Sequence, residues 1–268
     1  MTTTFDLLLT LSISLLIQAV LFVFAASFKT DKVTDLSYGL SFITLAVVLL
    51  VLNDSTQPAS RVLAAMVIVW GIRLAAYLLY RIVRIKRDPR FDGVRDRFWK
   101  FLQFWAFQGF IVWVIMLPVT LWFGNAGPWN GLMSVAVLVW ATGLIIETVA
   151  DAQKFAEKSR ASGRSRWMAS GLWRYSRHPN YFGELLCWWG IFLFVSGDLF
   201  GWSWMGILGP ISLTYILIYV TGIPTLERSA DRKWGDDVEY REYKERTSVL
   251  IPWFSSRRPM GDGFTSDP

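Results

Sequence analysis

The sequence predicts an all-α integral membrane protein, built as a bundle of about seven transmembrane helices. Hydrophobic residues make up 53% of the 268 residues and charged residues only 18%, whereas about 25% of an average globular chain is charged. The mean hydropathy is +0.37. Long apolar runs recur along the chain, and the basic residues gather between alternate runs. These three observations together are typical of a multi-pass membrane protein.

Each predicted helix corresponds to an apolar run of roughly the 20 residues that cross a bilayer. The second run is short, and the sixth nearly joins the seventh. The first run lacks a basic leading segment and is too long for a signal peptide, so we expect a retained helix. The predicted helices cover residues 5–28, 36–52, 61–83, 104–123, 131–150, 181–200 and 202–223.

The basic residues predict the orientation of the bundle. Of the 27 lysines and arginines, 24 follow the first, third, fifth and seventh helices, and only Arg61 lies in a segment on the opposite side. Cytoplasmic loops carry such an excess of positive charge. We therefore expect the N-terminus outside, a cytoplasmic C-terminal tail, and a site that faces the cytoplasm from a bacterial inner membrane or an endoplasmic reticulum.

The predicted organisation is one multi-pass membrane domain over residues 1–254. Residues 255–268 are rich in Ser, Gly, Pro and Arg and are predicted to be disordered. The chain shows no internal repeat, which argues against a transporter built from repeated halves.

The composition also excludes several kinds of site. One cysteine cannot form a disulfide framework and one histidine cannot form a paired-histidine zinc site, so no metal site is predicted. The chain has no Gly-x-Gly-x-x-Gly, no phosphate-binding P-loop and no Gly-x-Ser-x-Gly elbow. The net charge of +6 reflects topology, and no nucleic-acid partner is expected because no basic face interleaves with aromatic residues.

Four charged residues share one face at the end of the fifth predicted helix. They are Glu147, Asp151, Lys154 and Lys158, at spacings of 4, 3 and 4. One interpretation is an interfacial ladder of ion pairs. The other is the wall of a cofactor cleft, in which the acids accept ribose or amide hydrogens and the lysines meet phosphate.

A denser polar set lies in the run from Gly171 to Glu184, Gly-Leu-Trp-Arg-Tyr-Ser-Arg-His-Pro-Asn-Tyr-Phe-Gly-Glu. Pro179 favours an extended turn just before the sixth helix. A lone histidine is usually structural, but a helix entry so rich in donors and acceptors favours a site. The candidate residues are Arg174, Arg177, His178, Asn180, Tyr181 and Glu184.

Ionisable and hydroxyl groups also occur in the second and third predicted helices. Asp35 and Tyr38 stand at the start of the second, and Tyr77 lies in the third with Arg73. Asp35 is either an acid favoured by the helix dipole or a functional group, because an ionisable residue in a spanning helix is costly. Arg73 needs a partner, and Asp35 or Glu147 is expected to provide it.

The charged segment after Pro224 contains Glu227 and Tyr243 and has two interpretations. It is either an amphipathic helix that lies on the membrane or a lid over a cytoplasmic cleft. The residues alone favour neither.

The run from Gly171 to Glu184 resembles the membrane reductases of the steroid 5-alpha-reductase superfamily, which carry a Gly-x-Trp-x-x-x-Arg-His-Pro-Asn-Tyr-x-Gly-Glu pattern. The Asp151-Ala-Gln-Lys154 sequence before it is similar to a largely uncharacterised branch of that superfamily. The resemblance covers about residues 30–254. The Arg-His-Pro-x-Tyr-x-Gly part is shared with membrane methyltransferases of isoprenylcysteine and phospholipid amines.

The resemblance implies that NADPH is the cofactor and that residues 131–254 bind it. Glu147 departs from the family's asparagine, whereas Asp151, Asn180 and Glu184 match the family's residue types. Tyr243 takes the place of a C-terminal tyrosine of the family. The cofactor-binding candidates are Glu147, Asp151, Lys154, Lys158, Arg174, Arg177, His178, Asn180, Tyr181, Glu184 and Tyr243.

The resemblance also implies where the catalytic groups lie. The family's catalytic glutamate aligns with Asp35, but its catalytic tyrosine aligns with Trp70, so we expect the hydroxyl from Tyr38 or Tyr77. The implied reaction is hydride transfer from NADPH to a carbon–carbon double bond conjugated to a carbonyl. The lipophilic substrate would enter from the bilayer, and a neutral acid would hydrogen-bond its carbonyl oxygen.

Two other functions are compatible with the sequence. A membrane methyltransferase that uses S-adenosylmethionine would share the His-Pro-x-Tyr helix entry, yet it needs no acid to polarise a carbonyl. A non-enzymic scaffold or lipid-binding protein would bind no nucleotide and would tolerate replacement of Asn180. The acids of the fifth helix and the basic loops favour the reductase.

Overall fold

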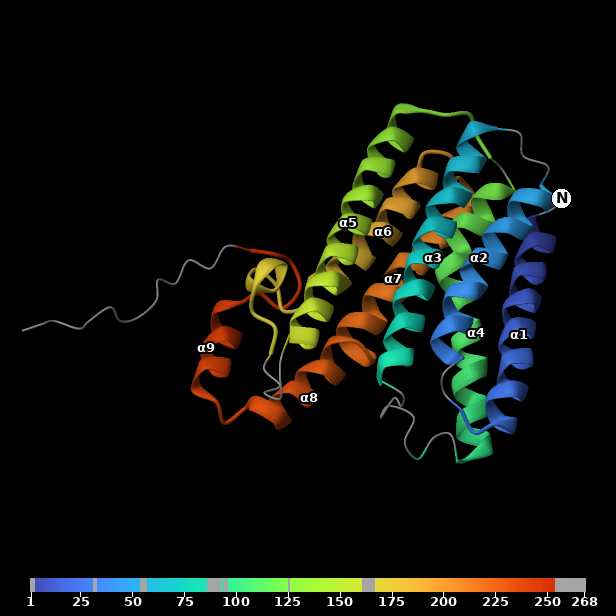
Figure 1. The fold of residues 1–268 in the computed structure, drawn as a ribbon. Helices are drawn as coiled ribbons and strands as arrows, with labels where there is room; N and C mark the ends of the chain where they lie inside the picture. The colour runs from blue at the N-terminus through green and yellow to red at the C-terminus, as the bar shows by residue number, and fades with distance from the viewer. Residues whose placement is uncertain are drawn as a thin grey trace, which may run out of the picture. The chain divides into compact units, whose positions relative to one another are not determined.

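The structure, a computed structural model, is built from helices (Figure 1). It describes residues 3–30, 33–53, 57–85, 93, 96–124, 126–160 and 167–253. Within these ranges no strand forms, and one isolated bridge pairs Ser176 with Ser248. The predicted all-α class is therefore confirmed for the described chain. The predicted disordered tail, 255–268, lies outside the described residues.

Helices cover each of the seven predicted segments. α5 runs ten residues beyond its predicted end at residue 150, so Asp151 and Lys154 belong to the helix. The first six elements of the bundle are α1 (Thr3–Ser27), α2 (Thr34–Leu52), α3 (Pro58–Ile85), α4 (Phe98–Phe123), α5 (Gly131–Arg160) and α6 (Pro179–Ser196), with the 3₁₀ helix η2 (Gly171–Arg174) before α6.

The seventh predicted helix, 202–223, is divided into shorter elements. These are the 3₁₀ helix η3 (Gly201–Ile207), α7 (Leu208–Tyr215), the π-helix η4 (Ile216–Val220) and the start of α8 (Ile223–Trp234), after which comes α9 (Val238–Arg246). Gly222 marks the break because a Cβ there would lie 2.5 Å from the carbonyl oxygen of Leu217. Pro224 stands in the first turn of α8, where its missing N–H is tolerated.

The chain divides into two compact units. The first comprises residues 1–142 and 185–215, and the second comprises residues 143–184 and 216–268. α5 and α6 each contribute residues to both units.

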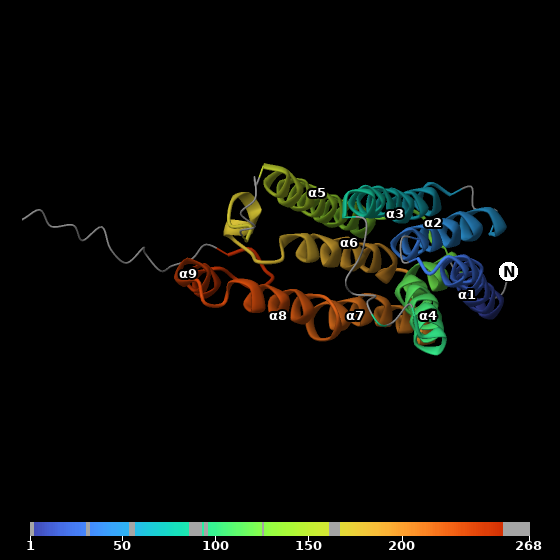
Figure 2. The same cartoon turned by 60° about the horizontal axis from the view of Figure 1, so that its bottom comes forward.

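In the first unit, α1, α2 and α4 pack together around a polar network (Figure 2). The side-chain amide of Gln18 donates to Ser41 at 2.9 Å, and that of Gln108 donates to Gln18 at 3.1 Å and to Ser37 at 2.8 Å. Hydrogen bonds between polar side chains join helices where apolar surroundings offer no water. The side chains of Gln18 and Gln108 therefore join the helices by hydrogen bonds, which is the usual role of a single polar residue in an apolar helix.

Glycine lets α2 and α3 approach closely. A Cβ added at Gly39 would lie 2.9 Å from Ala75 Cβ, and one added at Gly71 would lie 2.8 Å from Ile43 Cγ1. Small residues allow such close contact between membrane helices. Next to this contact, Trp70 is fully buried and packs at 5.2 Å on Phe42 and at 5.1 Å on Trp188, between ring centroids.

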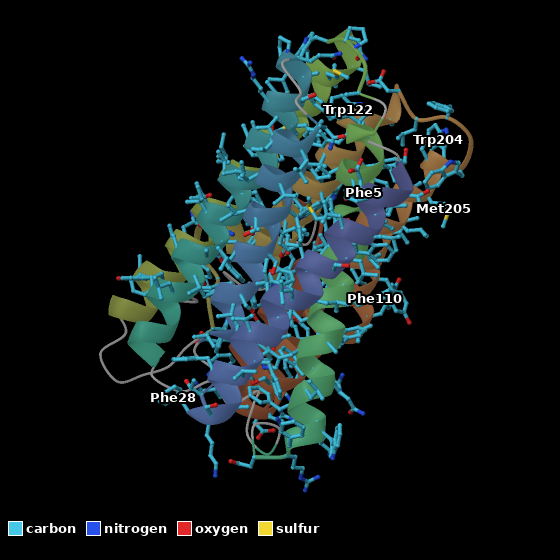
Figure 3. The ribbon with its side chains drawn as sticks, turned by 90° about the vertical axis from the view of Figure 1, so that its right-hand side faces the viewer. Phe5, Phe28, Phe110, Trp122, Trp204 and Met205 are labelled. Carbon is cyan, nitrogen blue, oxygen red and sulfur yellow. The ribbon has the colours of Figure 1, made fainter. Side chains whose placement is uncertain are left out.

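The first unit presents large apolar side chains on its surface. Phe5, Phe28 and Phe110 are 49%, 69% and 47% exposed, whereas Trp122 is buried (Figure 3). A water-soluble protein rarely exposes so large an apolar area, and lipid accounts for it. The five described stretches long and apolar enough to cross a membrane are Thr3–Ser27, Pro58–Tyr80, Phe98–Phe123, Gly131–Glu157 and Gly201–Trp234, with Leu36–Leu52 shorter.

In the second unit, the start of α6 lies against the backbone of α5. A Cβ added at Gly183 would lie 2.6 Å from both the amide nitrogen of Glu147 and the carbonyl oxygen of Gly143. Backbone atoms within a helix cannot move aside as a flexible side chain can. Gly183 therefore sets the distance between the two helices that carry most of the predicted cofactor residues.

We expect Gly183→Ala to destabilise the protein by about 1–3 kcal/mol, the usual cost of overpacking. Gly131→Ala is the matched control, because nothing lies within 4 Å of a Cβ there. The control should leave stability unchanged or raise it by at most about 1 kcal/mol. Thermal unfolding of both purified variants in detergent measures the difference, and equal midpoints would contradict the close approach.

Candidate functional site

Within the second unit, η2 lies beside the end of α5 (Figure 1), and three side-chain contacts attach the two elements. The side-chain carbonyl of Gln153 accepts the amide hydrogen of Leu172 at 2.9 Å, and the indole of Trp173 donates to the carbonyl of Ala150 at 2.9 Å. The ammonium of Lys154 lies 4.7 Å from the centroid of the Trp173 ring, a cation–π contact. The Asp-x-Gln-Lys sequence thus positions the start of the polar run.

Gly171 is required where the chain turns into η2. Its φ is +60°, a left-handed conformation that costs glycine little. A Cβ at this position would also collide with the side-chain amide of Gln153. The glycine therefore makes both the turn and the Gln153 hydrogen bond possible.

The segment after α9, residues 247–253, holds the other side of the polar run, and we name it the C-terminal strap. Three hydrogen bonds fix it: the amide of Arg177 to the carbonyl of Ser248 at 2.8 Å, the hydroxyl of Ser176 to the carbonyl of Leu250 at 2.7 Å, and the amide of Trp253 to the carbonyl of Tyr175 at 3.1 Å.

Glu227 of α8 lies at the centre of the resulting corner. Its carboxylate is 2.9 Å from His178 Nε2, 3.3 Å from Arg177 Nη2 and 3.2 Å from Lys244 Nζ. Its side chain is only 18% exposed. Charge-assisted hydrogen bonds at such distances are stronger than neutral ones, so one acid joins the polar run to α8 and α9.

α9 adds a second layer of contacts to the corner. The hydroxyl of Tyr243 donates to the carbonyl of Trp173 at 2.8 Å, and the guanidinium of Arg177 donates to the carbonyl of Lys244 at 2.7 Å. The ammonium of Lys244 also contacts Asp231 at 2.6 Å. An open depression of about 270 Å³ lies here, lined by Arg177, Arg241, Lys244 and Glu245.

Burial governs the protonation of two groups in this corner. Burial lowers the pKa of His178 below its usual 6.5, against the opposing effect of the Glu227 carboxylate. Burial raises the pKa of Tyr243 well above its usual value. Near neutral pH, His178 is therefore a neutral imidazole whose Nε2–H donates to Glu227, and Tyr243 stays a neutral donor.

The acids predicted to form a wall are placed beside the entry to α6. Glu147 and Asp151 are 2% and 4% exposed, and Glu147 lies directly against Gly183. Asn180 and Glu184 stand four residues apart on α6. The ring of Tyr181 stacks on that of His178 at 5.7 Å. Arg174 is exposed at the end of η2, and the side chain of Lys158 lies outside the described part of the chain.

Three buried polar atoms in this region have no hydrogen-bond partner among the described residues. They are Nδ1 of His178, Oδ1 of Asn180 and Nε of Arg177. A buried polar atom without a partner is costly and calls for an explanation, such as a ligand or an ordered water. Together with the neighbouring acids, this donor and acceptor set suits a ligand that carries phosphate and hydroxyl or amide groups.

The predicted catalytic residues belong to the first unit, whereas all the predicted cofactor residues belong to the second. Tyr38 lies on α2 and Tyr77 on α3, two helices that approach closely at Gly39 and Gly71. The guanidinium of Arg73 lies 5.5 Å from the centroid of the Tyr77 ring. The side chain of Asp35 lies outside the described part of the chain.

Sequence reasoning did not assign Glu227, Gln153 or Lys244 to the site. Each is a single polar residue on an amphipathic or charged segment, where solvated side chains are usual. For Gln153, the sequence did offer a signal, because this residue stands between Asp151 and Lys154, which were both predicted to belong to the site. Glu227 lies 49 residues from His178 in the sequence, so only the packing of α8 reveals the contact.

We expect Glu227→Gln to destabilise the protein by about 2 kcal/mol, because it leaves Arg177 and Lys244 without their shared counter-charge. Glu242→Gln is the matched control, since among the described residues the exposed Glu242 pairs with Arg246 at 3.4 Å. Such a surface pair contributes less than about 1 kcal/mol. Thermal unfolding of the two variants tests this, and an equal effect would show that Glu227 does not hold the corner together.

The single histidine of the chain allows a direct test of its environment. We expect the NMR signal of labelled His178 to titrate below pH 6.5. In the window between its lowered pKa and 6.5 the unfolded chain binds more protons, so stability should fall as the pH drops through that window. Glu227→Gln should lower the midpoint further, and a midpoint above 6.5 in the unmodified protein would contradict a buried neutral imidazole.

A curated relative, Methanethiol S-methyltransferase 1 of Bradyrhizobium diazoefficiens, is 34% identical over 82 residues, or 31% of this chain. The match spans 25% of that relative's length. No solved structure matches the chain. The family model described as Protein of unknown function (DUF1295) matches residues 21–247. These comparisons support a membrane enzyme, and because the family model spans most of the sequence, the chain belongs to the DUF1295 family.

Proposed function

We propose that this protein is a membrane-embedded reductase that uses NADPH to reduce a carbon–carbon double bond conjugated to a carbonyl. The substrate would be a steroid-like or other lipid enone that enters from the bilayer. The proposal also places the cofactor site on the cytoplasmic side of the membrane. NADPH, when bound, supplies the hydride.

One observation carries the cofactor assignment: the unpartnered buried atoms at the entry to α6. In this proposal Asn180 Oδ1 and His178 Nδ1 would accept hydrogens from amide or ribose groups, and Arg177 Nε would donate to a phosphate. The buried acids Glu147 and Asp151 offer acceptors for ribose hydroxyls. This combination of acceptors and cations suits a dinucleotide better than it suits a ligand with a single charge.

The cations nearby support an anionic cofactor in particular. Arg177, Arg241 and Lys244 line one open depression, with Glu245 as its only acid. Guanidinium and ammonium groups are preferred partners of phosphate. A 2′-phosphate on the ribose would add two negative charges for them to bind, so we propose that NADPH is preferred to NADH.

The polarising group is proposed to come from α2 or α3. As hydride reaches an enone, negative charge develops on the carbonyl oxygen, and a fixed hydroxyl donor stabilises that charge. Tyr38 and Tyr77 are the candidate hydroxyl donors, on two helices whose close approach depends on Gly39 and Gly71. Asp35 stays a candidate acid. Trp70, at the position of the family's tyrosine, is packed in the core.

A second function is favoured by one specific observation. The 82-residue similarity is to a protein named as a methyltransferase of methanethiol. S-adenosylmethionine carries a positive sulfonium, and a carboxylate such as Glu147 or Asp151 would be a suitable neighbour for it. A methyl transfer of this kind requires no donor for a carbonyl oxygen.

Ligand binding to the detergent-purified protein separates the two functions. We expect calorimetric titration to give binding of NADPH, weaker binding of NADH, and none of S-adenosylmethionine. Asn180→Ala should weaken NADPH binding about tenfold, because one lost hydrogen bond to a buried group costs about 1–2 kcal/mol. Asn53→Ala is the matched control, since in the described part of the chain Asn53 bonds to Leu49 at the end of α2, in the first unit.

Binding of S-adenosylmethionine without NADPH would replace the reductase by the methyltransferase. If NADPH binds but Asn180→Ala and Asn53→Ala have equal affinity, the cofactor is correct and its assignment to the entry of α6 is wrong.

A further inference from the structure

Contacts on several sides fix the ring of His178. Its backbone amide donates to the hydroxyl of Ser176 at 3.1 Å, and its carbonyl accepts the amide hydrogen of Phe182 at 3.1 Å. The imidazole stacks on the ring of Tyr181, with 5.7 Å between centroids and 12° between planes. Nε2 lies 2.9 Å from the carboxylate of Glu227. The ring therefore has one fixed orientation, in which Nδ1 is the remaining nitrogen.

The carboxylate determines which nitrogen of this ring carries the hydrogen. A neutral imidazole has one N–H donor and one acceptor nitrogen, and the hydrogen bond at one nitrogen decides the state of the other. A carboxylate only accepts hydrogen bonds. Nε2 of His178 must then carry the hydrogen that Glu227 accepts, so Nδ1 presents a lone pair. This Nδ1 is buried and has no partner in the part of the chain that the structure describes.

The adjacent residue imposes the opposite requirement. Nε of Arg177 is a donor, and it too is buried with no partner among the described residues. A ligand that satisfies both atoms must offer an acceptor, such as a phosphate oxygen, to Arg177 and a hydroxyl or N–H to His178. An ionised phosphate oxygen cannot satisfy Nδ1, because both are acceptors. A sugar hydroxyl beside a phosphate meets both requirements, and nucleotide cofactors contain that pair.

The geometry points to Glu227 as a positioning residue, which holds His178 in its Nε2–H tautomer so that Nδ1 accepts a hydrogen bond from a hydroxyl or N–H group of the cofactor. The part of this inference that concerns the cofactor rests on the proposed function, whereas the part that concerns the tautomer does not. Acid weakens the binding of such a ligand, because protonation places a hydrogen on Nδ1 and converts the acceptor into a donor.

Burial and the charged groups around the imidazole set the pH at which this change occurs. Burial lowers the pKa of His178 below its usual 6.5 and is the largest effect. Glu227 of α8 opposes it, whereas Lys154 of α5 and the neighbouring Arg177 act in the same direction as burial. Lys244 of α9 acts through its contact with Glu227. The acceptor is therefore present near neutral pH and is lost below pH 6.5.

Nitrogen NMR of the ligand-free protein tests the tautomer, since the chain has one histidine. With isotope-labelled histidine at mildly alkaline pH, we expect Nε2 to give the signal of a protonated nitrogen and Nδ1 that of a nitrogen with a lone pair. Glu227→Gln keeps an acceptor and should keep this pattern. Glu227→Leu removes the acceptor, and the two signals should move toward each other as the tautomers mix. Glu242→Leu, at an exposed site on α9, is the matched control and should change neither signal.

Two results would overturn the positioning role. One is a hydrogen on Nδ1 in the unmodified protein, and this result is decisive even if Glu227→Leu does not fold. The other is an unchanged pair of signals in a folded Glu227→Leu variant, since the tautomer would then not depend on the carboxylate.

The pH dependence of cofactor binding tests the acceptor. NADP⁺ is the probe because it is stable in acid, and His178→Gln, which has no imidazole to titrate, measures the pH dependence of the cofactor itself. Relative to that variant, we expect the affinity of the unmodified protein to fall about tenfold for each pH unit below the pKa of His178, because only the neutral form binds.

Two results would overturn the acceptor. An affinity that rises in acid would show that a phosphate faces Nδ1, and an equal pH dependence in the two proteins would show that no donor of the cofactor faces it. Absence of NADP⁺ binding at every pH would instead contradict the proposed function, and the NMR result would still decide the role of Glu227.

Discussion

The second unit depends on one carboxylate. Glu227 is the shared partner of Arg177, His178 and Lys244, and it therefore joins both the entry to α6 and α9 to α8. Without an acid at this position, two cations would face each other across a partly buried space, which is unfavourable at short range. The neutral state of His178 has another cause, because burial lowers the pKa of the imidazole against the opposing effect of this carboxylate.

The polar run from Gly171 to Glu184 can be recognised in the sequence because its polar residues are contiguous, and its role as a site stays a prediction. α6 begins at Pro179, two residues before the predicted start at 181, because proline is accepted in the first turn of a helix. The long helices can be predicted because apolar runs of sufficient length define them. In the seventh segment the break at Gly222 lies beside the predicted end at 223, whereas composition does not reveal the change from 3₁₀ to α to π geometry within the segment.

The residues that contact the polar run could not be predicted from the residue types alone. Gln153 and Glu227 meet their partners over 19 and 49 residues of chain, through side chains of ordinary type on charged segments. Periodicity identifies the face of a helix but not the neighbour that the face contacts. The family resemblance supplied candidate roles for Asn180 and Tyr243, and the structure adds that the hydroxyl of Tyr243 is bonded to the backbone of Trp173. Their roles toward a cofactor stay predictions.

The bonds of the C-terminal strap join residues that are 70 or more positions apart, as in the 74-residue separation of Ser176 and Leu250. A chain grows by about 5–20 residues per second, so the corner around His178 waits roughly 4–15 s for the residues that complete it. During that time α5 and α6 can already enter the membrane. Assembly of the corner is therefore a late event in biosynthesis, and a nascent chain halted before residue 247 would carry inserted helices and an unfinished site.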